Sequence, residues 1–185
     1  MRVESVQIMK NSKIHAVVFI LAAALQGMAE EPSLNPHLAL LQPLLGKSMK
    51  GEFIGSTPEK PIVDVQHWER ALNGQAVRMT HSINNGFYGG ETIFVWDEKK
   101  QAVVFYYFTT ETFMTTGTIK EVEGRLVASE AVTGDANGIT EVRSTSEFQP
   151  GGKLHVKAEY LKDGKWTFGH EATYAEDSTA RVVFR

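Results

Sequence analysis

The chain has 185 residues, a net charge of -3 at pH 7 and no cysteine. The acidic balance argues against a nucleic-acid partner, because binding phosphates requires a basic surface. The absence of cysteine excludes disulfides, zinc-thiolate sites and a cysteine nucleophile. The length suits one domain with a short additional segment.

Residues 1–29 have the layout of a secretory signal peptide. Lys13 ends a basic start, an apolar run covers residues 14–25, and Ala29 closes a stretch of small residues suited to cleavage. A membrane anchor is the alternative, but the run is shorter than the roughly 20 residues that cross a bilayer. The sequence therefore predicts an exported protein, periplasmic or secreted, whose mature domain covers residues 30–185 without a stable membrane anchor.

The first element of the predicted mature domain is a short helix over residues 33–46. Asn35 is a good N-cap, Pro36 suits the first helical position, and Gly46 suits a left-handed exit. Leucines recur at helical spacing, with Leu38, Leu41 and Leu45 as the central stripe. Pro43 should kink or shorten the helix. We expect this helix to close one end of a barrel or to pack on its side.

The rest of the chain predicts β-strands separated by turns. The expected strands cover residues 63–72, 75–83, 91–96, 102–110, 115–122, 125–133, 139–148, 153–161, 166–174 and 179–185. Short strands at regular spacing with short connections are typical of an up-and-down meander. Because closure removes the unpaired edges, we predict an all-β fold: an antiparallel up-and-down barrel of about ten strands.

Alternation along the strands assigns side chains to the two faces of the sheet. On the strand over residues 75–83, Met79 and His81 share the apolar face, and on the last long strand His170 and Tyr174 do the same. A mainly apolar interior with a few polar groups is the usual composition of a small-molecule pocket. The candidate ligand-binding residues are His81, His170, Tyr106, Tyr160, Tyr174, Ser144, Met79 and Tyr88. Each inward histidine has a plainer alternative as a hydrogen-bonded core residue.

A further candidate pair of side chains lies on the strand over residues 63–72. Glu69 and His67 stand two positions apart, so they share a face and could form an acid–base pair or two metal ligands. One pair is too few for a metal site, and an exposed salt-bridging face is the favoured interpretation. We predict neither a bound metal nor a cofactor.

Two stretches resemble known families. Residues 44–51 (LLGKSMKG), after a short helix, are similar to the Gly-x-Trp entry of calycins, the lipocalin-like barrels, with Met49 in place of the tryptophan and Arg181 as a remnant of its arginine partner. Residues 68–74 (WERALNG), followed by Tyr88-Gly89-Gly90-Glu91 and Trp96-Asp97, resemble the uncharacterised DUF1579-type barrels. This resemblance covers residues 44–117 and implies a lipocalin-like barrel, but that family has no agreed activity to transfer.

The resemblance extends more remotely to nitrobindin-type haem barrels, which bind haem iron through a histidine near the end of the chain. His170 stands in about that region, although the glycine-rich entry motif of those barrels is absent.

The leading hypothesis is a barrel that binds a small apolar or amphipathic molecule. Three alternatives remain: an enzyme that uses an inward histidine as acid or base, a haem-binding barrel, and an interaction module that forms a homodimer through outward aromatic side chains.

Overall fold

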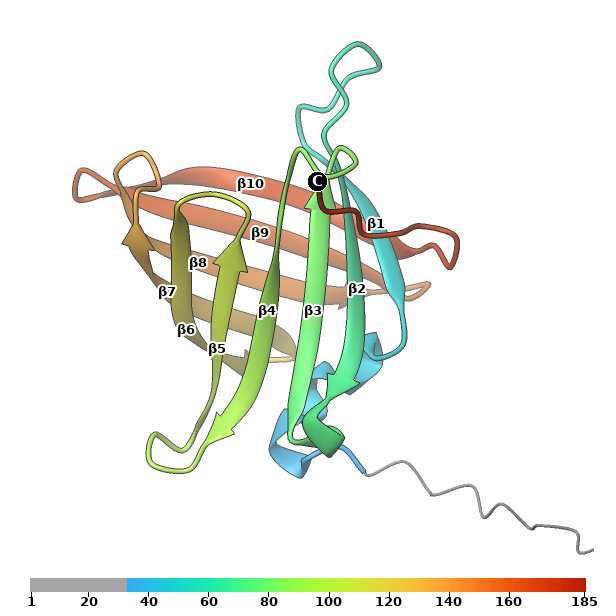
Figure 1. Cartoon of the computed structure of the whole chain (residues 1–185), viewed down its shortest axis with the longest axis vertical. Helices are drawn as coiled ribbons and strands as arrows, with labels where there is room; N and C mark the ends of the chain where they lie inside the picture. The colour runs from blue at the N-terminus through green and yellow to red at the C-terminus, as the bar shows by residue number, and fades with distance from the viewer. Residues whose placement is uncertain (1–32) are drawn as a thin grey trace, which may run out of the picture. The chain divides into compact units, whose positions relative to one another are not determined.

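Ten antiparallel strands close into a barrel in the computed structural model, which describes residues 33–185 (Figure 1). The predicted signal peptide, residues 1–29, lies outside the described residues. The strands are β1 (Ser48–Phe53), β2 (Val63–Ala71), β3 (Ala76–Ile83), β4 (Tyr88–Asp97), β5 (Ala102–Thr109), β6 (Phe113–Val122), β7 (Arg125–Gly134), β8 (Ile139–Gln149), β9 (Lys153–Lys162) and β10 (Lys165–Glu176).

Each strand pairs with its neighbours in sequence, and β1 also pairs with β10. The last pairing closes the sheet, so that no strand is left with an unpaired edge. The predicted all-β, up-and-down barrel is therefore confirmed.

The identity of the tenth strand differs from the prediction. Residues 179–185 form no strand, and β1 takes the expected place instead. After β10 the Asp177 carboxylate accepts hydrogen bonds from Thr179 and Ala180, and this turn directs the chain away from the sheet. The tail then crosses the outside of the barrel, where the Val183 N–H donates to the Ser82 hydroxyl at 3.0 Å (Figure 1).

The Asn73-Gly74 signal does form a turn between β2 and β3. Both residues have positive φ, 54° and 83°, which is the conformation that Asn and Gly tolerate best. A Cβ on Gly74 would also lie 2.1 Å from the Ser33 carbonyl oxygen, so the position accommodates only glycine. The turn is a short 3₁₀ segment, η2 (Leu72–Gly74).

The predicted helix is a 3₁₀ helix, η1 (Pro36–Leu44), with Asn35 accepting a hydrogen bond from His37 N–H at 3.0 Å. A 3₁₀ helix has three residues per turn, so Leu38, Leu41 and Leu44 fall on one face, and all three are buried. Leu45, predicted for this stripe, is only partly buried. Within residues 33–185, no helix is long and apolar enough to cross a bilayer.

The barrel interior has two halves. The half next to η1 is filled by buried apolar side chains from the strand ends that meet there, among them Met49, Trp68, Phe94, Phe105 and Leu154. The opposite half receives the other strand ends, and these carry several polar inward side chains, among them Asp64, His81 and Tyr107. Helix η1 thus closes one end of the barrel, and the other end holds the candidate site.

Candidate functional site

A cavity of about 440 Å³ occupies the barrel interior. Its volume lies within the roughly 300–1,000 Å³ range of small-molecule pockets. Leu44 of η1 forms part of its floor, and Ala136 and Asn137 of the β7–β8 turn line it as well. The wall is mainly apolar, and most of its polar side chains belong to three sets of hydrogen bonds.

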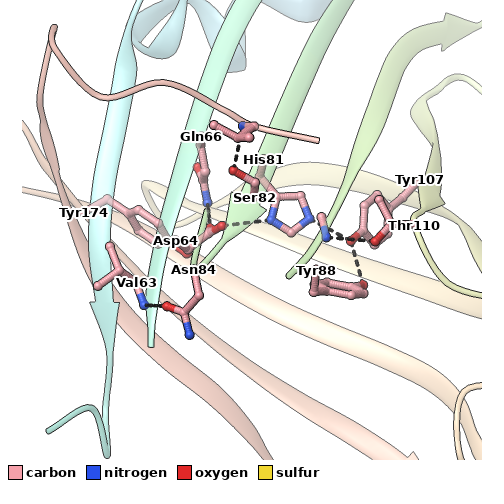
Figure 2. Close-up of polar contacts among 12 residues, drawn as sticks. Val63, Asp64, Gln66, His81, Ser82, Asn84, Tyr88, Tyr107, Thr110 and Tyr174 are labelled. Atoms are coloured by element: carbon pink, nitrogen blue, oxygen red, sulfur yellow. Dashed lines mark hydrogen bonds and ion pairs between the residues drawn. The ribbon is translucent and has the colours of Figure 1, made fainter. Parts of the chain in front are cut away.

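The first set is a chain of four side chains from four consecutive strands. His81 Nδ1 lies 2.9 Å from the Asp64 carboxylate, and His81 Nε2 lies 2.7 Å from the Tyr107 hydroxyl. The Tyr107 hydroxyl is in turn 2.7 Å from the Tyr88 hydroxyl. Figure 2 shows the His81 ring between Asp64 and Tyr107, with Tyr88 at the far end of the chain.

Asp64 anchors this chain from a buried position, with 2% of its surface exposed. Its carboxylate also accepts hydrogen bonds from the Tyr174 hydroxyl at 2.9 Å and from Gln66 Nε2 at 3.3 Å. With donors directed at both oxygens, Asp64 acts as an acceptor only. His81 therefore donates to Asp64 through Nδ1–H, and in the neutral ring Nε2 then accepts the Tyr107 proton.

Burial changes the pKa of the two tyrosines in this chain and of Tyr174, which donates to Asp64. Loss of solvation raises the pKa of Tyr107 and of Tyr88 above the ordinary value, and it raises the pKa of Tyr174 as well. A tyrosine with the ordinary pKa already keeps its proton at neutral pH, and the raised pKa values extend the protonated range of all three hydroxyls to higher pH.

Gly90 on β4 lets Tyr107 reach His81, two strands away. A Cβ at position 90 would lie 2.4 Å from the Tyr107 ring and 2.2 Å from the Phe108 carbonyl oxygen. The ring thus covers the backbone of β4 where a side chain would otherwise stand. The glycine-rich stretch Tyr88-Gly89-Gly90-Glu91 is part of strand β4. Gly90 makes room there for the ring of Tyr107.

The second set joins β9 to β10. The Tyr160 hydroxyl lies 2.7 Å from His170 Nδ1, and the Phe53 ring stacks on His170 with centroids 4.9 Å apart. Gly169 permits this pairing, since a Cβ there would lie 2.7 Å from the Tyr160 ring. Burial lowers the pKa of His170 and raises the pKa of Tyr160 to about 12, so both side chains are neutral near pH 7.

The third set is the shortest. Glu130 on β7 lies on the cavity wall, and the Thr115 hydroxyl of β6 donates to its carboxyl group. Among residues 33–185, no Lys, Arg or His forms an ion pair with Glu130. Loss of solvation raises the pKa of Glu130 above its ordinary value, with the Thr115 hydrogen bond opposing the shift.

Glu130→Gln should therefore change how stability depends on pH. In the wild type the folded state holds a proton that the unfolded chain releases above about pH 4.5, the ordinary carboxyl value. Stability is lost as pH rises from there through the raised pKa. Removing the carboxyl removes this loss, so we expect the variant to gain stability relative to wild type between pH 4.5 and neutrality. Thermal melting across this range measures the difference.

The matched control for this experiment is Glu141→Gln on neighbouring β8, an exposed carboxylate on the outer face. Its stability difference from wild type should stay flat with pH. Parallel pH profiles for Glu130→Gln and wild type would contradict the assignment.

Seven of the eight predicted ligand-binding residues lie on the cavity wall. These are His81, His170, Tyr160, Tyr174, Ser144, Met79 and Tyr88. Tyr106 does not: its side chain is 43% exposed on the outer face, and its neighbour Tyr107 occupies the inward position. The run around Tyr106 is apolar or aromatic on both faces, so alternation could not identify the inward member. The contribution of the other seven to ligand binding stays a prediction.

Sequence reasoning missed the polar side chains Asp64, Gln66 and Glu130. The valines 63 and 65 made the opposite face of β2 look like the inner one, but they lie in an outer groove beside the C-terminal tail. Trp68, which shares the face of Asp64 and is buried, was the signal that could have identified the inner face. Glu130 interrupts an otherwise small and apolar stripe of β7, and such an interruption is itself a signal.

Glu69 stands on the outer face of β2, as the favoured interpretation predicted. Its carboxylate forms an ion pair with Arg78 Nη1 at 2.8 Å, and both side chains are about two-fifths exposed. His67 donates to or accepts from the Ser48 hydroxyl and does not contact Glu69. Within the described part of the chain, no three His, Cys, Asp or Glu side chains group as they would around a metal ion.

Haem, which the remote resemblance implies, fits this interior only in part. An axial histidine usually bonds a second partner through its other ring nitrogen, and the Tyr160 contact to His170 Nδ1 meets that condition. However, the described part of the chain places no Lys or Arg on the cavity wall to pair with the two carboxylates of haem, and Glu130 lines the same space. The residues present thus suit the haem iron but not the carboxylates of the haem group.

No family model matches the chain, and no curated protein does either. Among solved structures, the crystal structure of Rv2717c from M. tuberculosis is similar, with a TM-score of 0.59 and 14% sequence identity. The alignment covers 78% of this chain and 99% of that one. At this identity the similarity shows a shared barrel fold and nothing about activity.

Proposed function

We propose that this protein binds a small, mainly apolar molecule inside its barrel. The observation that supports the proposal is the cavity of about 440 Å³, which has a mainly apolar wall with a small number of polar groups on it. Apolar surface supplies affinity in such pockets, and a few fixed polar groups supply orientation and specificity. The apolar part of the ligand would lie toward η1, and its polar part would meet the hydrogen-bonding groups at the other end.

Filling the cavity should abolish binding. Ser144→Trp places an indole on the cavity wall, whereas Thr145→Trp adds the same side chain to the outer face of the same strand. With N-phenyl-1-naphthylamine as a fluorescent probe, we expect wild type and Thr145→Trp to bind alike and Ser144→Trp to lose at least about tenfold in affinity, or about 1.4 kcal/mol.

Ser144→Leu, a smaller change, serves if the indole prevents folding, which circular dichroism will show. Equal binding by all variants would place the probe outside the barrel and contradict the proposal.

A second candidate function is an enzyme with an acid–base step, and His170 favours it. Burial lowers the pKa of its imidazole, and its Nε2 has no hydrogen-bond partner among the described residues. A neutral imidazole open to a cavity can act as a general base. The test uses 5-nitrobenzisoxazole, which opens when a base removes its proton. Turnover by wild type that disappears in His170→Gln supports this function, and equal rates contradict it.

We also propose that the protein works outside the cytoplasm, on the basis of the pattern in residues 1–29. Mass spectrometry of the protein recovered from cell fractions tests this. An exported chain that begins at Glu30 supports cleavage after Ala29, and an intact chain in the cytoplasm contradicts it.

A further inference from the structure

The direction of the hydrogen bonds in the Asp64–His81–Tyr107–Tyr88 chain determines whether Tyr88 acts as a donor or an acceptor toward a ligand in the cavity. With a neutral His81 ring, Asp64 accepts from His81 Nδ1–H and His81 Nε2 accepts from Tyr107, so that Tyr107 can accept only from Tyr88. The single proton of the Tyr88 hydroxyl is therefore used within the chain. What Tyr88 presents to the cavity is oxygen lone pairs, so this end of the cavity favours a hydrogen-bond donor.

Glu130 adds a second acceptor on the cavity wall. Its carboxyl group has only the Thr115 hydroxyl as a described partner, although a carboxylate can accept about four hydrogen bonds. A carboxyl group left without a cation in an apolar setting is costly unless it is protonated or paired. A cation bound in the cavity would supply the ion-pair partner that the Glu130 carboxylate lacks among the described residues.

The remaining wall admits a cation and disfavours an anion. Among residues 33–185, no Lys or Arg lines the cavity, so the carboxylate of a fatty acid would find no basic partner on this wall. Aromatic rings are present instead: Tyr88 stacks with Phe113 at 6.4 Å between centroids, and Phe113 precedes Thr115 by two positions on β6. Faces of aromatic rings attract ammonium groups, and such rings recognise quaternary ammonium ligands in proteins.

We propose that the ligand is an organic cation, a protonated amine or quaternary ammonium whose charged end pairs with Glu130 beside Tyr88 and Phe113 and whose apolar remainder points toward η1. This inference rests on the proposed function and specifies the chemical class of the ligand. Binding requires Glu130 to release its proton, because only the carboxylate forms the ion pair.

The test compares two probes of the same shape. Benzyltrimethylammonium carries a fixed charge, and neopentylbenzene replaces its nitrogen with carbon. Each is titrated against N-phenyl-1-naphthylamine bound to the full chain, with wild type, Glu130→Gln and the outer-face control Glu141→Gln. At pH 8 we expect the cation to bind at least about tenfold tighter than its neutral counterpart in wild type and in Glu141→Gln, and this preference to disappear in Glu130→Gln.

A pH series adds a measurement that needs no variant. The other ionisable groups of the wall are Asp64, His81, His170 and the tyrosines of the three hydrogen-bonded sets. In wild type the preference for the cation should fall as acid protonates Glu130. In Glu130→Gln, any pH dependence of the cation preference that remains arises from the other ionisable groups of the wall. The difference between the wild-type and Glu130→Gln pH series is therefore due to Glu130.

The outcomes separate the two proposals. If N-phenyl-1-naphthylamine binds and neopentylbenzene displaces it as well as the cation does, or if Glu130→Gln keeps the preference, the inference is overturned and the proposed function stands. If none of the three molecules binds, the proposed function fails, and the inference fails with it.

Discussion

Replacing Asp64 with alanine is expected to lower the free energy of unfolding by about 2–6 kcal/mol, because two buried donors lose their acceptor at about 1–3 kcal/mol each. Asp64 is buried and accepts hydrogen bonds from three side chains, so its removal leaves the Tyr174 hydroxyl and the His81 N–H without an acceptor. Buried donors that lose their partner bear the full cost of lost solvation. Because small domains are stable by only about 5–15 kcal/mol, this one change should bring the barrel close to unfolding. Urea denaturation followed by circular dichroism measures the loss.

Glu69→Ala is the matched control for that experiment. It removes a carboxylate from the same strand, but from an exposed ion pair with Arg78 on the outer face. Exposed ion pairs contribute about 0–1 kcal/mol, so the control should change stability little. Similar losses in the two variants would show that Asp64 does not anchor the interior.

The second large effect concerns the closed end of the barrel. Leu41→Ala should destabilise the protein by about 2–5 kcal/mol, because the leucine has no exposed surface and its loss leaves a cavity beneath η1. The same denaturation experiment measures the change. Binding of N-phenyl-1-naphthylamine should weaken as well, since Leu44 of the same helix forms part of the cavity floor.

Leu72→Ala is the control for this change, since Leu72 is 70% exposed in the β2–β3 turn. We expect it to cost less than about 0.5 kcal/mol. If Leu41→Ala were equally mild, η1 would not contribute to the core, and the assignment of the closed end would be wrong.

The strands and their inner faces were largely predictable from the sequence. Alternation on β3, β8 and β9 correctly placed Met79, Ser144 and Tyr160 on the cavity wall. These strands have one apolar and one polar face, and in that case a period of two is unambiguous. Leucine spacing predicted a helix before the barrel, and the three-residue spacing that suits a 3₁₀ helix was already present in the sequence.

Alternation of apolar and polar residues failed to predict the inward face of a strand where tertiary contacts bury apolar side chains on the outer face or where a bulge shifts the register. The tail covers part of the outer face beside β2, so apolar valines there point outward. On β10 the register shifts between Phe168 and His170, and Phe168 is 57% exposed although strict alternation would put it on the same face as His170. A bulge inserts one residue and reverses the face of the side chains beyond it.

By itself, the sequence determined that this chain forms turn-separated antiparallel strands with an apolar face, because that information lies in the spacing of neighbouring residues. Only the tertiary structure decided which strand closes the barrel and which polar groups meet inside it. Asp64 and Tyr174 are 110 positions apart, and they meet because β1 pairs with both β2 and β10. Pairing between distant strands depends on the closure of the whole sheet, which no local window of sequence contains.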